Sequence, residues 1–415
     1  MQENKTRKVL ILTADAGFGH RSAANAVKGA LEQRYSTSIK VEIANPLDDK
    51  RAPFFLRDSQ SDYDRIVRNL PELYRVGYET SDARLLIPVL ENALTVLLFD
   101  VMRDIMKQFQ PDAVITTYPL YQAPLVAVRT LHRYQVPIYT VVTDLVSVHR
   151  IWFHPQIDQY FVPTEEVSEL AQNNRVSPDR IEISGIPVSP LFSTLSADKE
   201  ALRNELGWQQ GKTTFLVVGS RRVEQLEATL NTLNHSGHDI QFVCVAGKDQ
   251  ALYKQLMATD WHKPAYIYEF VSDMPKLMLA SDCLISKAGG LIVSESLAAG
   301  LPILLIDIIP GQETGNAEYV VHHGAGEIAL DTVTILETVF HWLNEDGKIL
   351  RECTQKARNL GKPGAAFTIA EKTWEGQKAT PNIDLGLAKE LRENLIRLLE
   401  RYHVDIPAEF PLRKK

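Results

Sequence analysis

Cysteine is scarce in this chain, and an excess of positive charge is absent. The 415 residues include 3 cysteines, which are widely separated and odd in number: Cys244, Cys283 and Cys353. Their spacing fits neither a disulfide framework nor a metal site, and it favours a reducing compartment. The formal net charge of −7 argues against a general nucleic-acid binder, because such proteins present a basic surface.

Long hydrophobic runs are missing as well. No stretch of about 18 apolar residues is present, so the sequence predicts no membrane span. The first residues, MQENKTRK, lead directly into a short apolar run and contain no apolar signal core. We therefore expect a cytoplasmic protein, and binding to a membrane surface stays open. The length suits two domains with a sizeable core each.

Short apolar runs alternate with helical patterns along the whole chain. The runs are continuously apolar, which is typical of parallel strands that are covered on both faces. Helical candidates between them include 21–33, 120–134 and 291–299. This regular alternation predicts an α/β protein of doubly wound domains. The predicted strands are Lys8–Thr13, Ile39–Ala44, Ala113–Thr117, Pro137–Thr143, Gln159–Val162, Thr214–Val218, Gln241–Ala246, Ala265–Glu269, Cys283–Ile285 and Pro302–Ile306.

A linker is expected at 185–196, GIPVSPLFSTLS, where prolines, a glycine and serines cluster. The sequence thus predicts a first domain over 1–190 and a second over 197–380. A last helical pattern at about 385–403 is expected to pack back on the first domain. Two similar domains imply a cleft between them, and ligands of open α/β sheets bind beyond the carboxyl ends of the strands.

One segment, 48–81, interrupts the alternation and is rich in aromatic residues and arginine. A long apolar helix follows over 85–109, with a proline at Pro88. Two interpretations remain. The segment is a helical cap over the sheet, or it is a surface that touches a bilayer. The second would use apolar residues next to arginines, namely Phe54, Phe55 and Leu56 beside Arg51 and Arg57.

The first motif, DAGFGHRSAANAV, follows the first predicted strand. Gly17 and Gly19 permit a tight turn and a close approach of a ligand to the backbone. The helix that begins near His20 points its free N–H groups at that ligand. His20 and Asp15 are therefore candidates to take a proton from an incoming hydroxyl. A dinucleotide-binding loop or a plain turn is the alternative, but Ser22 stands where the dinucleotide motif needs its third glycine.

The second motif, TDLVSVHRIWFHP, follows the predicted strand that ends at Thr143. Its polar residues have poor spacing for a metal site. We expect a loop that lines the binding cleft, with Trp152 and Phe153 against an apolar part of an acceptor and histidines against polar parts. The candidate acceptor-binding residues in this loop are Asp144, His149, Trp152 and His154.

The third motif spans 281–326 and contains two successive strand–helix junctions. Two helix N-termini that face one site suit a diphosphate, with Lys287 nearby. A carboxylate such as Glu295 suits the two hydroxyls of a ribose, and polar residues of the second junction suit sugar hydroxyls. Ordinary turn glycines and surface polar residues are the alternative. The residues concerned are Lys287, Gly289, Gly290, Glu295, Gln312, Glu313 and Asn316.

Together, these motifs resemble the monogalactosyldiacylglycerol synthase and processive diacylglycerol glucosyltransferase family, and the segment PGQETGN at 310–316 is especially specific. The similarity extends from about Lys8 to Thr380. It implies a GT-B fold of two Rossmann-like domains, related to the peptidoglycan N-acetylglucosaminyltransferase. The implied activity is inverting transfer of glucose or galactose from a UDP-sugar to diacylglycerol or a glycosyl-diacylglycerol. No metal or other cofactor is implied, and the enzyme would sit at the inner face of the cell membrane, against anionic lipid.

The resemblance also assigns residues. It implies that Gly19 and His20 lie near the reaction centre, that Asp15 is a second candidate base, and that Glu295 binds ribose. It places the W-x-H element of Trp152 and His154 at the acceptor side, where Gly17 of the first motif's turn is a further candidate. On the donor side it implies a loop with Gly219, Ser220 and Arg221, an aromatic Phe270 next to the uracil-reading backbone of Val271, and the cluster Gln312, Glu313 and Asn316.

Departures from the family concern three positions. The loop GSRRVEQ retains Gly219 alone of a longer glycine-rich loop, so Arg221 or Arg222 would bind phosphate in its place. Leu291 follows KAGG where a hydroxyl residue is common, and Phe18 replaces a small residue. Three alternatives therefore stay open: a polyprenyl-linked or soluble acceptor, a sugar-nucleotide epimerase, and a UDP-sugar-binding relative without turnover.

Overall fold

The chain forms two compact units. The computed structural model describes residues 6–16, 19–54, 56–57, 87–195, 198–219, 223, 225–309, 313–376, 393–394, 396–398 and 400–402. The first unit comprises Met1–Asp144, Val148–Pro187 and Ala365–Lys415, and the second comprises Leu145–Ser147 and Val188–Gly364. Within the described ranges, no helix combines the length and apolarity that a membrane crossing needs.

A six-stranded sheet, in which all neighbouring strands are parallel, forms the centre of the first unit. The spatial order is β2-β1-β3-β4-β5-β6. In β1, four successive apolar residues from Val9 to Leu12 are buried, which fits a strand that is covered on both faces. The strands are β1 (Arg7–Leu12), β2 (Ile39–Ala44), β3 (Ala113–Thr116), β4 (Ile138–Val141), β5 (Gln159–Val162) and β6 (Ile181–Ile183).

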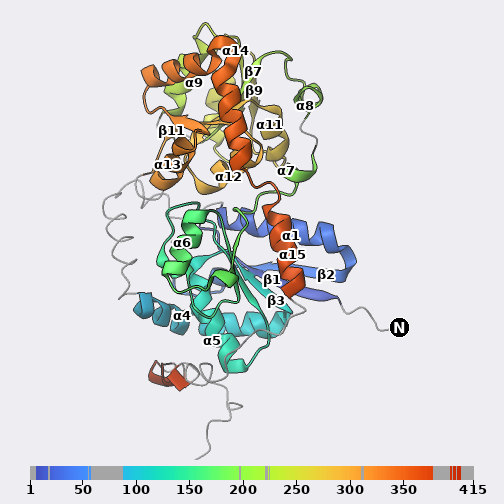
Figure 1. Ribbon diagram of the computed structural model, residues 1–415, viewed down its shortest axis with the longest axis vertical. Helices are drawn as coiled ribbons and strands as arrows, with labels where there is room; N and C mark the ends of the chain where they lie inside the picture. The colour runs from blue at the N-terminus through green and yellow to red at the C-terminus, as the bar shows by residue number, and fades with distance from the viewer. Residues whose placement is uncertain are drawn as a thin grey trace, which may run out of the picture. The chain divides into compact units, whose positions relative to one another are not determined.

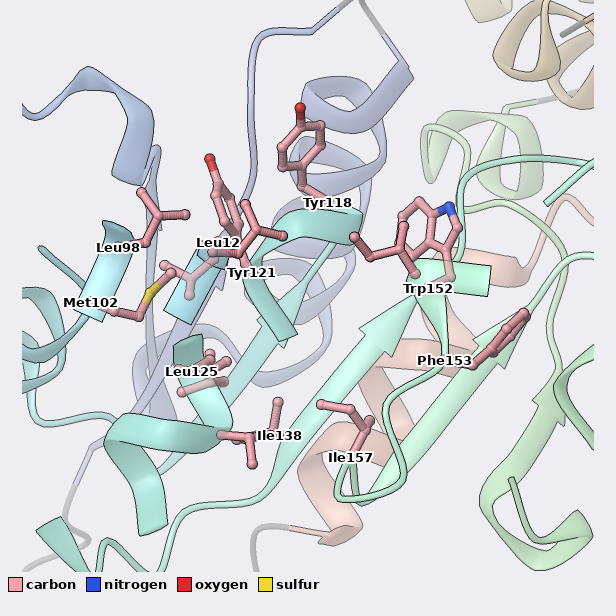
Figure 2. Close-up of a cluster of buried hydrophobic side chains, with 14 of the residues drawn as sticks. Leu12, Leu98, Met102, Tyr118, Tyr121, Leu125, Ile138, Trp152, Phe153 and Ile157 are labelled. Carbon is pink, nitrogen blue, oxygen red and sulfur yellow. The ribbon is translucent and has the colours of Figure 1, made fainter. Parts of the chain in front are cut away.

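Helices cover both faces of this sheet (Figure 1). Alternate residues of β1 point to opposite faces, so Val9 and Ile11 join one core cluster while Leu10 and Leu12 join the other. The first cluster contains residues of α1 (Gly19–Tyr35) and α15 (Ala365–Gly376). The second, shown in Figure 2, contains residues of α4 (Ile87–Phe109) and α5 (Gln122–His132). The remaining helices are α6 (Glu165–Asn173) and the 3₁₀ turns η1 (Ser36–Ser38), η2 (Pro46–Asp48), η3 (Pro119–Tyr121), η4 (Arg150–Trp152) and η5 (Pro178–Arg180).

Helix α15 returns the chain to the first unit and packs beside α1 (Figure 1). Trp374 stacks on Tyr35 with ring centroids 4.2 Å apart, and the Arg7 guanidinium lies 4.3 Å from the Trp374 centroid. The predicted second domain, 197–380, therefore ends too late. Of the predicted terminal helix, the structure describes residues between 393 and 402, and Ile396 packs against a core cluster of the first unit.

The second unit holds another six-stranded parallel sheet, in the spatial order β12-β11-β10-β7-β8-β9. Its strands are β7 (Thr213–Val218), β8 (Ile240–Val245), β9 (Ala265–Tyr268), β10 (Cys283–Lys287), β11 (Ile303–Asp307) and β12 (Gly326–Ile328). Its helices are α7 (Leu191–Thr194), α8 (Lys199–Leu206), α9 (Leu226–Asn234), α10 (Gln250–Ala258), α11 (Met274–Ala280), α12 (Gly290–Ala298), α13 (Thr314–His322) and α14 (Thr332–Leu360). The backbone of α14 leaves the helical conformation at Asn344–Gly347. The three cysteines are buried free thiols.

The strand order fixes where each unit can bind a ligand. Each sheet reverses its winding direction at one point, between β1 and β3 in the first unit and between β7 and β10 in the second. Ligands of doubly wound sheets bind beyond the carboxyl ends of the strands at such a point. The predicted doubly wound architecture is thus confirmed, and the first and third motifs lie at these two positions.

Candidate functional site

His20 lies in the first turn of α1, beyond the carboxyl end of β1, and its ring is held through one nitrogen. Nδ1 lies 2.9 Å from the carbonyl oxygen of Thr117 and 2.7 Å from Oγ1 of Thr143. A carbonyl oxygen can only accept a hydrogen bond, so we assign the ring proton to Nδ1. Nε2 is then left unprotonated, with a lone pair that can accept a proton from another molecule.

The ends of β3 and β4 supply these contacts. Thr117 Oγ1 also donates to the backbone carbonyl of His20 at 3.0 Å, so α1 and the end of β3 are tied in both directions. Sequence reasoning did not single out Thr117 or Thr143, which lie 97 and 123 residues from His20 in the chain. The available signal was a hydroxyl residue at the end of each predicted strand, Ala113–Thr117 and Pro137–Thr143.

Two aromatic rings flank the imidazole. Tyr118 meets it edge-on with centroids 5.0 Å apart, and the ring of Trp152 lies 6.1 Å away in a tilted arrangement. Figure 2 shows Tyr118 and Trp152 in the core cluster, with the indole nitrogen turned away from the other labelled side chains. Both side chains are buried, so water has little access to the imidazole from this side.

Asp144 follows Thr143 directly and is held by Trp152. The indole N–H donates to Oδ2 of Asp144 at 2.8 Å. Burial lowers the pKa of His20, and the negative charge of Asp144 and the Thr117 carbonyl act in the opposite direction. Burial also raises the pKa of Asp144, against the influence of His20, the indole and His149. His20 and Asp144, both half-buried, thus influence each other's protonation through their charges.

Asp15, the other candidate base, has different surroundings. Its carboxylate is exposed and accepts two hydrogen bonds from the Arg21 guanidinium, at 2.8 and 3.0 Å. Asn45 Nδ2 lies 3.5 Å from Oδ2. Both oxygens of Asp15 are therefore already engaged. Gly19 is the first residue of α1, while Gly17 lies outside the described residues.

The two loop histidines use one ring nitrogen each for the backbone. Nδ1 of His149 accepts from the N–H of Ile151 at 3.1 Å, and Nδ1 of His154 accepts from Gln156 at 3.3 Å. Burial, together with the positive charge of Arg129, lowers the pKa of His154 to about 4, so His154 is neutral at physiological pH. Trp152 is fully buried. That these side chains contact an acceptor stays a prediction.

In the second unit, Lys287 ends β10 and is paired with a carboxylate. Its Nζ lies 2.5 Å from Oε1 of Glu313, whose other oxygen accepts from the N–H of Ile309 at 3.0 Å. Glu313 is buried. The pair joins the end of β10 to the loop before α13. It also neutralises a lysine that the sequence suggested would lie near a diphosphate.

The N-termini of α12 and α13 follow β10 and β11. Gly289 is the N-cap of α12 and Gly290 its first residue, with no side-chain cap on the free N–H groups. Asn316, in the first turn of α13, donates to the carbonyl of Ala288 at 3.0 Å. This hydrogen bond connects the two junctions, and that they face one diphosphate stays a prediction. Uncapped helix N-termini favour an anion.

Glu295, in the second turn of α12, is half-buried, and no hydrogen bond or ion pair from the described residues reaches its carboxylate. Burial raises its pKa to about 7. A carboxylate in this environment would gain from hydroxyl donors, because hydrogen bonds stabilise its charged form.

The remaining donor-side candidates also follow carboxyl ends of strands. Phe270 follows β9 after one intervening residue and is 65% exposed, with Val271 half-buried beside it. Gly219 directly follows β7, and a Cβ there would meet Leu226 at 3.1 Å, so this turn is closely packed. Ser286 Oγ donates to the carbonyl of Val218 at 2.9 Å, which joins β10 to β7 at the winding reversal.

Several predictions fall outside the described residues, namely those for Gly17, Phe18, Phe55, Ser220, Arg221, Arg222 and Gln312. Across the described part of the chain, no three histidine, cysteine, aspartate or glutamate side chains gather in a way that could hold a metal ion.

Comparison with known families divides the chain in the same way. Residues 20–188 match the model of monogalactosyldiacylglycerol (MGDG) synthase, and residues 213–367 match the glycosyltransferase family 28 C-terminal domain. The chain is 31% identical over 382 residues to a probable monogalactosyldiacylglycerol synthase 3, chloroplastic, of Oryza sativa subsp. japonica, covering 90% of this chain and 75% of that protein. Identity to monogalactosyldiacylglycerol synthase 1, chloroplastic, of Arabidopsis thaliana is 30% over 385 residues, with coverage of 90% and 72%.

Solved structures share the fold at low identity. MurG of Acinetobacter baumannii superposes with a TM-score of 0.57 at 17% identity, covering 89% of this chain and 99% of that structure. The UDP-GlcNAc 2-epimerase of Neisseria meningitidis gives a TM-score of 0.55 at 15% identity, with coverage of 89% and 100%. The expected fold, that of the GT-B glycosyltransferases, is confirmed.

Proposed function

Because this chain belongs to the monogalactosyldiacylglycerol synthase family, we propose that it transfers a hexose, glucose or galactose, from a UDP-sugar to diacylglycerol or a glycosyl-diacylglycerol. The observation that carries the mechanism is the His20 imidazole, held through Nδ1 with Nε2 free as a base. It lies at the winding reversal of its sheet, where α/β enzymes bind their ligands.

In the proposed reaction, Nε2 of His20 removes the proton from the acceptor hydroxyl. The hydroxyl oxygen attacks the anomeric carbon from the face opposite the UDP group, so a new glycosidic bond forms and the bond to UDP breaks with inversion. The imidazolium then releases its proton to solvent. General-base assistance of this kind contributes about 100-fold or more to the rate.

The departing UDP carries the negative charge that develops in this step. The uncapped N-termini of α12 and α13 would stabilise it, as a substitute for a metal ion. Glu295 would accept hydrogen bonds from the two ribose hydroxyls, and Phe270 with the backbone of Val271 would hold the uracil. Gln312, Glu313 and Asn316 would contact the hexose or phosphate. The proposal includes no cofactor besides the UDP-sugar substrate.

A lipid acceptor also implies a membrane surface, and we place the enzyme as a peripheral protein at the inner face of the cell membrane. Phe54 is 68% exposed and Val89 is 63% exposed, both on the first unit. Arg51, expected to meet anionic headgroups, is instead paired with Asp49 and Asp104 at 2.7 Å each. Apolar contact rather than charge therefore supports this part of the proposal.

The test combines donor and acceptor in one assay. The full-length protein is incubated with liposomes that contain diacylglycerol and with UDP-glucose or UDP-galactose. Glycolipid formation with release of one UDP per hexose is expected for one donor. No glycolipid with either donor contradicts the proposal.

Three controls separate the alternatives. Conversion of the UDP-sugar without any acceptor would indicate an epimerase. Transfer to a soluble glycoside by protein that does not float with liposomes would indicate a soluble acceptor. UDP binding without either reaction would indicate a relative without turnover.

A further inference from the structure

The hydrogen bond between Trp152 and Asp144 has no role in the mechanism above, although it lies beside the proposed base. Asp144 directly follows Thr143, whose hydroxyl contacts Nδ1 of His20 at 2.7 Å. The indole N–H of Trp152 reaches back over 8 residues to Oδ2 of Asp144 at 2.8 Å. Trp152 is fully buried, so the donor is fixed by the core around it.

A carboxylate acts on the imidazole. The negative charge of Asp144 raises the pKa of His20, while His20 and His149 lower that of Asp144. The other contact of the imidazole with a raising effect on the His20 pKa is the neutral carbonyl of Thr117. When Nε2 takes a proton, Asp144 supplies a compensating negative charge to the imidazolium. Both side chains are half-buried, so this interaction is screened less than in bulk water.

We propose that Asp144 is a positioning residue that stabilises the imidazolium of His20 during proton transfer, and that the indole N–H of Trp152 holds the Asp144 carboxylate in place for this purpose. The inference rests on the proposed function for its effect on turnover. Its electrostatic part, the influence of Asp144 on His20, is independent of any reaction.

The indole suits this task because it can only donate a hydrogen bond. It leaves the second oxygen of Asp144 unengaged by the indole and directs the carboxylate without neutralising it. An arginine or lysine in its place would cancel the charge that the imidazolium needs. The sequence analysis made Trp152 and Asp144 candidates for acceptor binding, whereas the hydrogen bond that the structure shows joins them to each other.

The second unit offers a matched control. Trp342 is also fully buried, and its indole N–H donates to Oε1 of Glu327 at 2.6 Å. This pair has the same chemistry but belongs to the core and edge of the other sheet. Trp342→Phe and Glu327→Gln therefore report what the loss of a buried indole–carboxylate hydrogen bond does to the protein in general.

The experiment measures kcat and KM against pH for the full-length protein and the variants Asp144→Asn, Trp152→Phe, Trp342→Phe and Glu327→Gln. Asparagine retains an oxygen for the indole but removes the charge, so Asp144→Asn is expected to lower kcat by about 10- to 100-fold. KM for the UDP-sugar should stay within about twofold. The acidic limb of the pH profile should move to lower pH, because His20 loses the charge that raises its pKa. Trp152→Phe should lower kcat and move the acidic limb to lower pH as well, each by a smaller amount.

A second measurement does not depend on activity. The His20 imidazole is titrated by NMR in ¹³C-histidine-labelled protein, with His20→Gln for assignment. Asp144→Asn should lower the His20 pKa, and the two control variants should leave it unchanged. If Asp144→Asn leaves both the His20 pKa and the acidic limb of the pH profile unchanged, the inference is overturned, whatever happens to kcat. A shifted pKa in a protein that makes no glycolipid supports the pair and contradicts the proposed function.

Discussion

Two side chains are candidates for the general base, and their surroundings distinguish them. The exposed carboxylate of Asp15 is already bound by Arg21 through two hydrogen bonds. The imidazole of His20 is fixed through Nδ1 by the ends of two strands, and Nε2 stays available. A base needs a free lone pair and a fixed position, so the structure favours His20.

This difference predicts unequal effects of two substitutions. His20→Ala should lower kcat by about 100-fold or more, because it removes the group that accepts the proton. Asp15→Asn should lower kcat by less than about 10-fold, because an exposed pair with Arg21 contributes little. Glycolipid formation at saturating concentrations of both substrates measures both effects. An equal or larger loss in Asp15→Asn contradicts the assignment of the base.

A third side chain, Glu295, predicts a pH-dependent affinity for the donor. Burial raises its pKa to about 7 in the free protein, and hydroxyl donors from ribose would favour its charged form. Binding should therefore release a proton below pH 7. Since the group is about nine-tenths protonated one unit below its pKa, affinity at pH 6 should be about 10-fold weaker than at pH 8.

Calorimetry with a UDP-hexose across this range, in buffers of different ionisation enthalpy, measures both the affinity and the proton release. A UDP-hexose is preferred to UDP, whose terminal phosphate titrates in the same range. Glu295→Gln should bind more weakly and without pH dependence. A pH-dependent affinity that persists in this variant excludes Glu295 as its source.

Much of the candidate site could be anticipated from single residues, but their partners could not. Glycines and polar residues after apolar strands marked His20, Lys287 and Glu295 as candidates. Nothing local in the sequence indicates that Glu313 is buried against Lys287 and the N–H of Ile309. Such contacts depend on which strands are neighbours in the sheet, and neighbouring strands are far apart in the chain.

At the scale of elements, continuous apolar runs predicted every strand longer than three residues. The two that were missed, β6 and β12, have three residues each. Runs this short do not differ from loop sequence in their pattern. The apolar helix expected over 85–109 is confirmed over Ile87–Phe109, the part of it that the structure describes, and this part includes Pro88.

Helix α15 was assigned to the wrong domain, because the short connection GKPG after α14 does not reveal that the chain changes units. Its attachment to the first unit predicts a measurable stability. Trp374→Ala should lower the free energy of unfolding by about 2–3 kcal/mol, since it removes the stack on Tyr35 and the Arg7 contact. Urea denaturation measures this change.

Trp374→Phe retains an aromatic ring for Tyr35 and Arg7 and should lose about 1 kcal/mol or less. Equal losses for alanine and phenylalanine would show that the stack contributes nothing to the attachment of α15.

On the scale of the whole molecule, the two units carry separate parts of the proposed chemistry. The candidate base and its partners belong to the first unit, and the candidate UDP-sugar residues belong to the second. The two sheets have the same parallel construction, but their winding reversals lie after different strands. This division agrees with the separate family matches of the two halves.

The overall charge and the local surface act in opposite directions at a membrane. A net charge of −7 opposes approach to an anionic bilayer, so binding would have to come from apolar side chains on one face. Phe54 at 68% and Val89 at 63% exposure are the candidates on the first unit. Replacing both by aspartate should lower flotation with anionic liposomes by about 10-fold or more, since insertion of their apolar area is lost.

Val333 at 62% and Phe340 at 60% exposure provide a matched control on the second unit. Their double replacement by aspartate adds the same charge and should leave flotation unchanged. Equal losses in both double variants would attribute binding to net charge and contradict an apolar membrane contact at Phe54 and Val89.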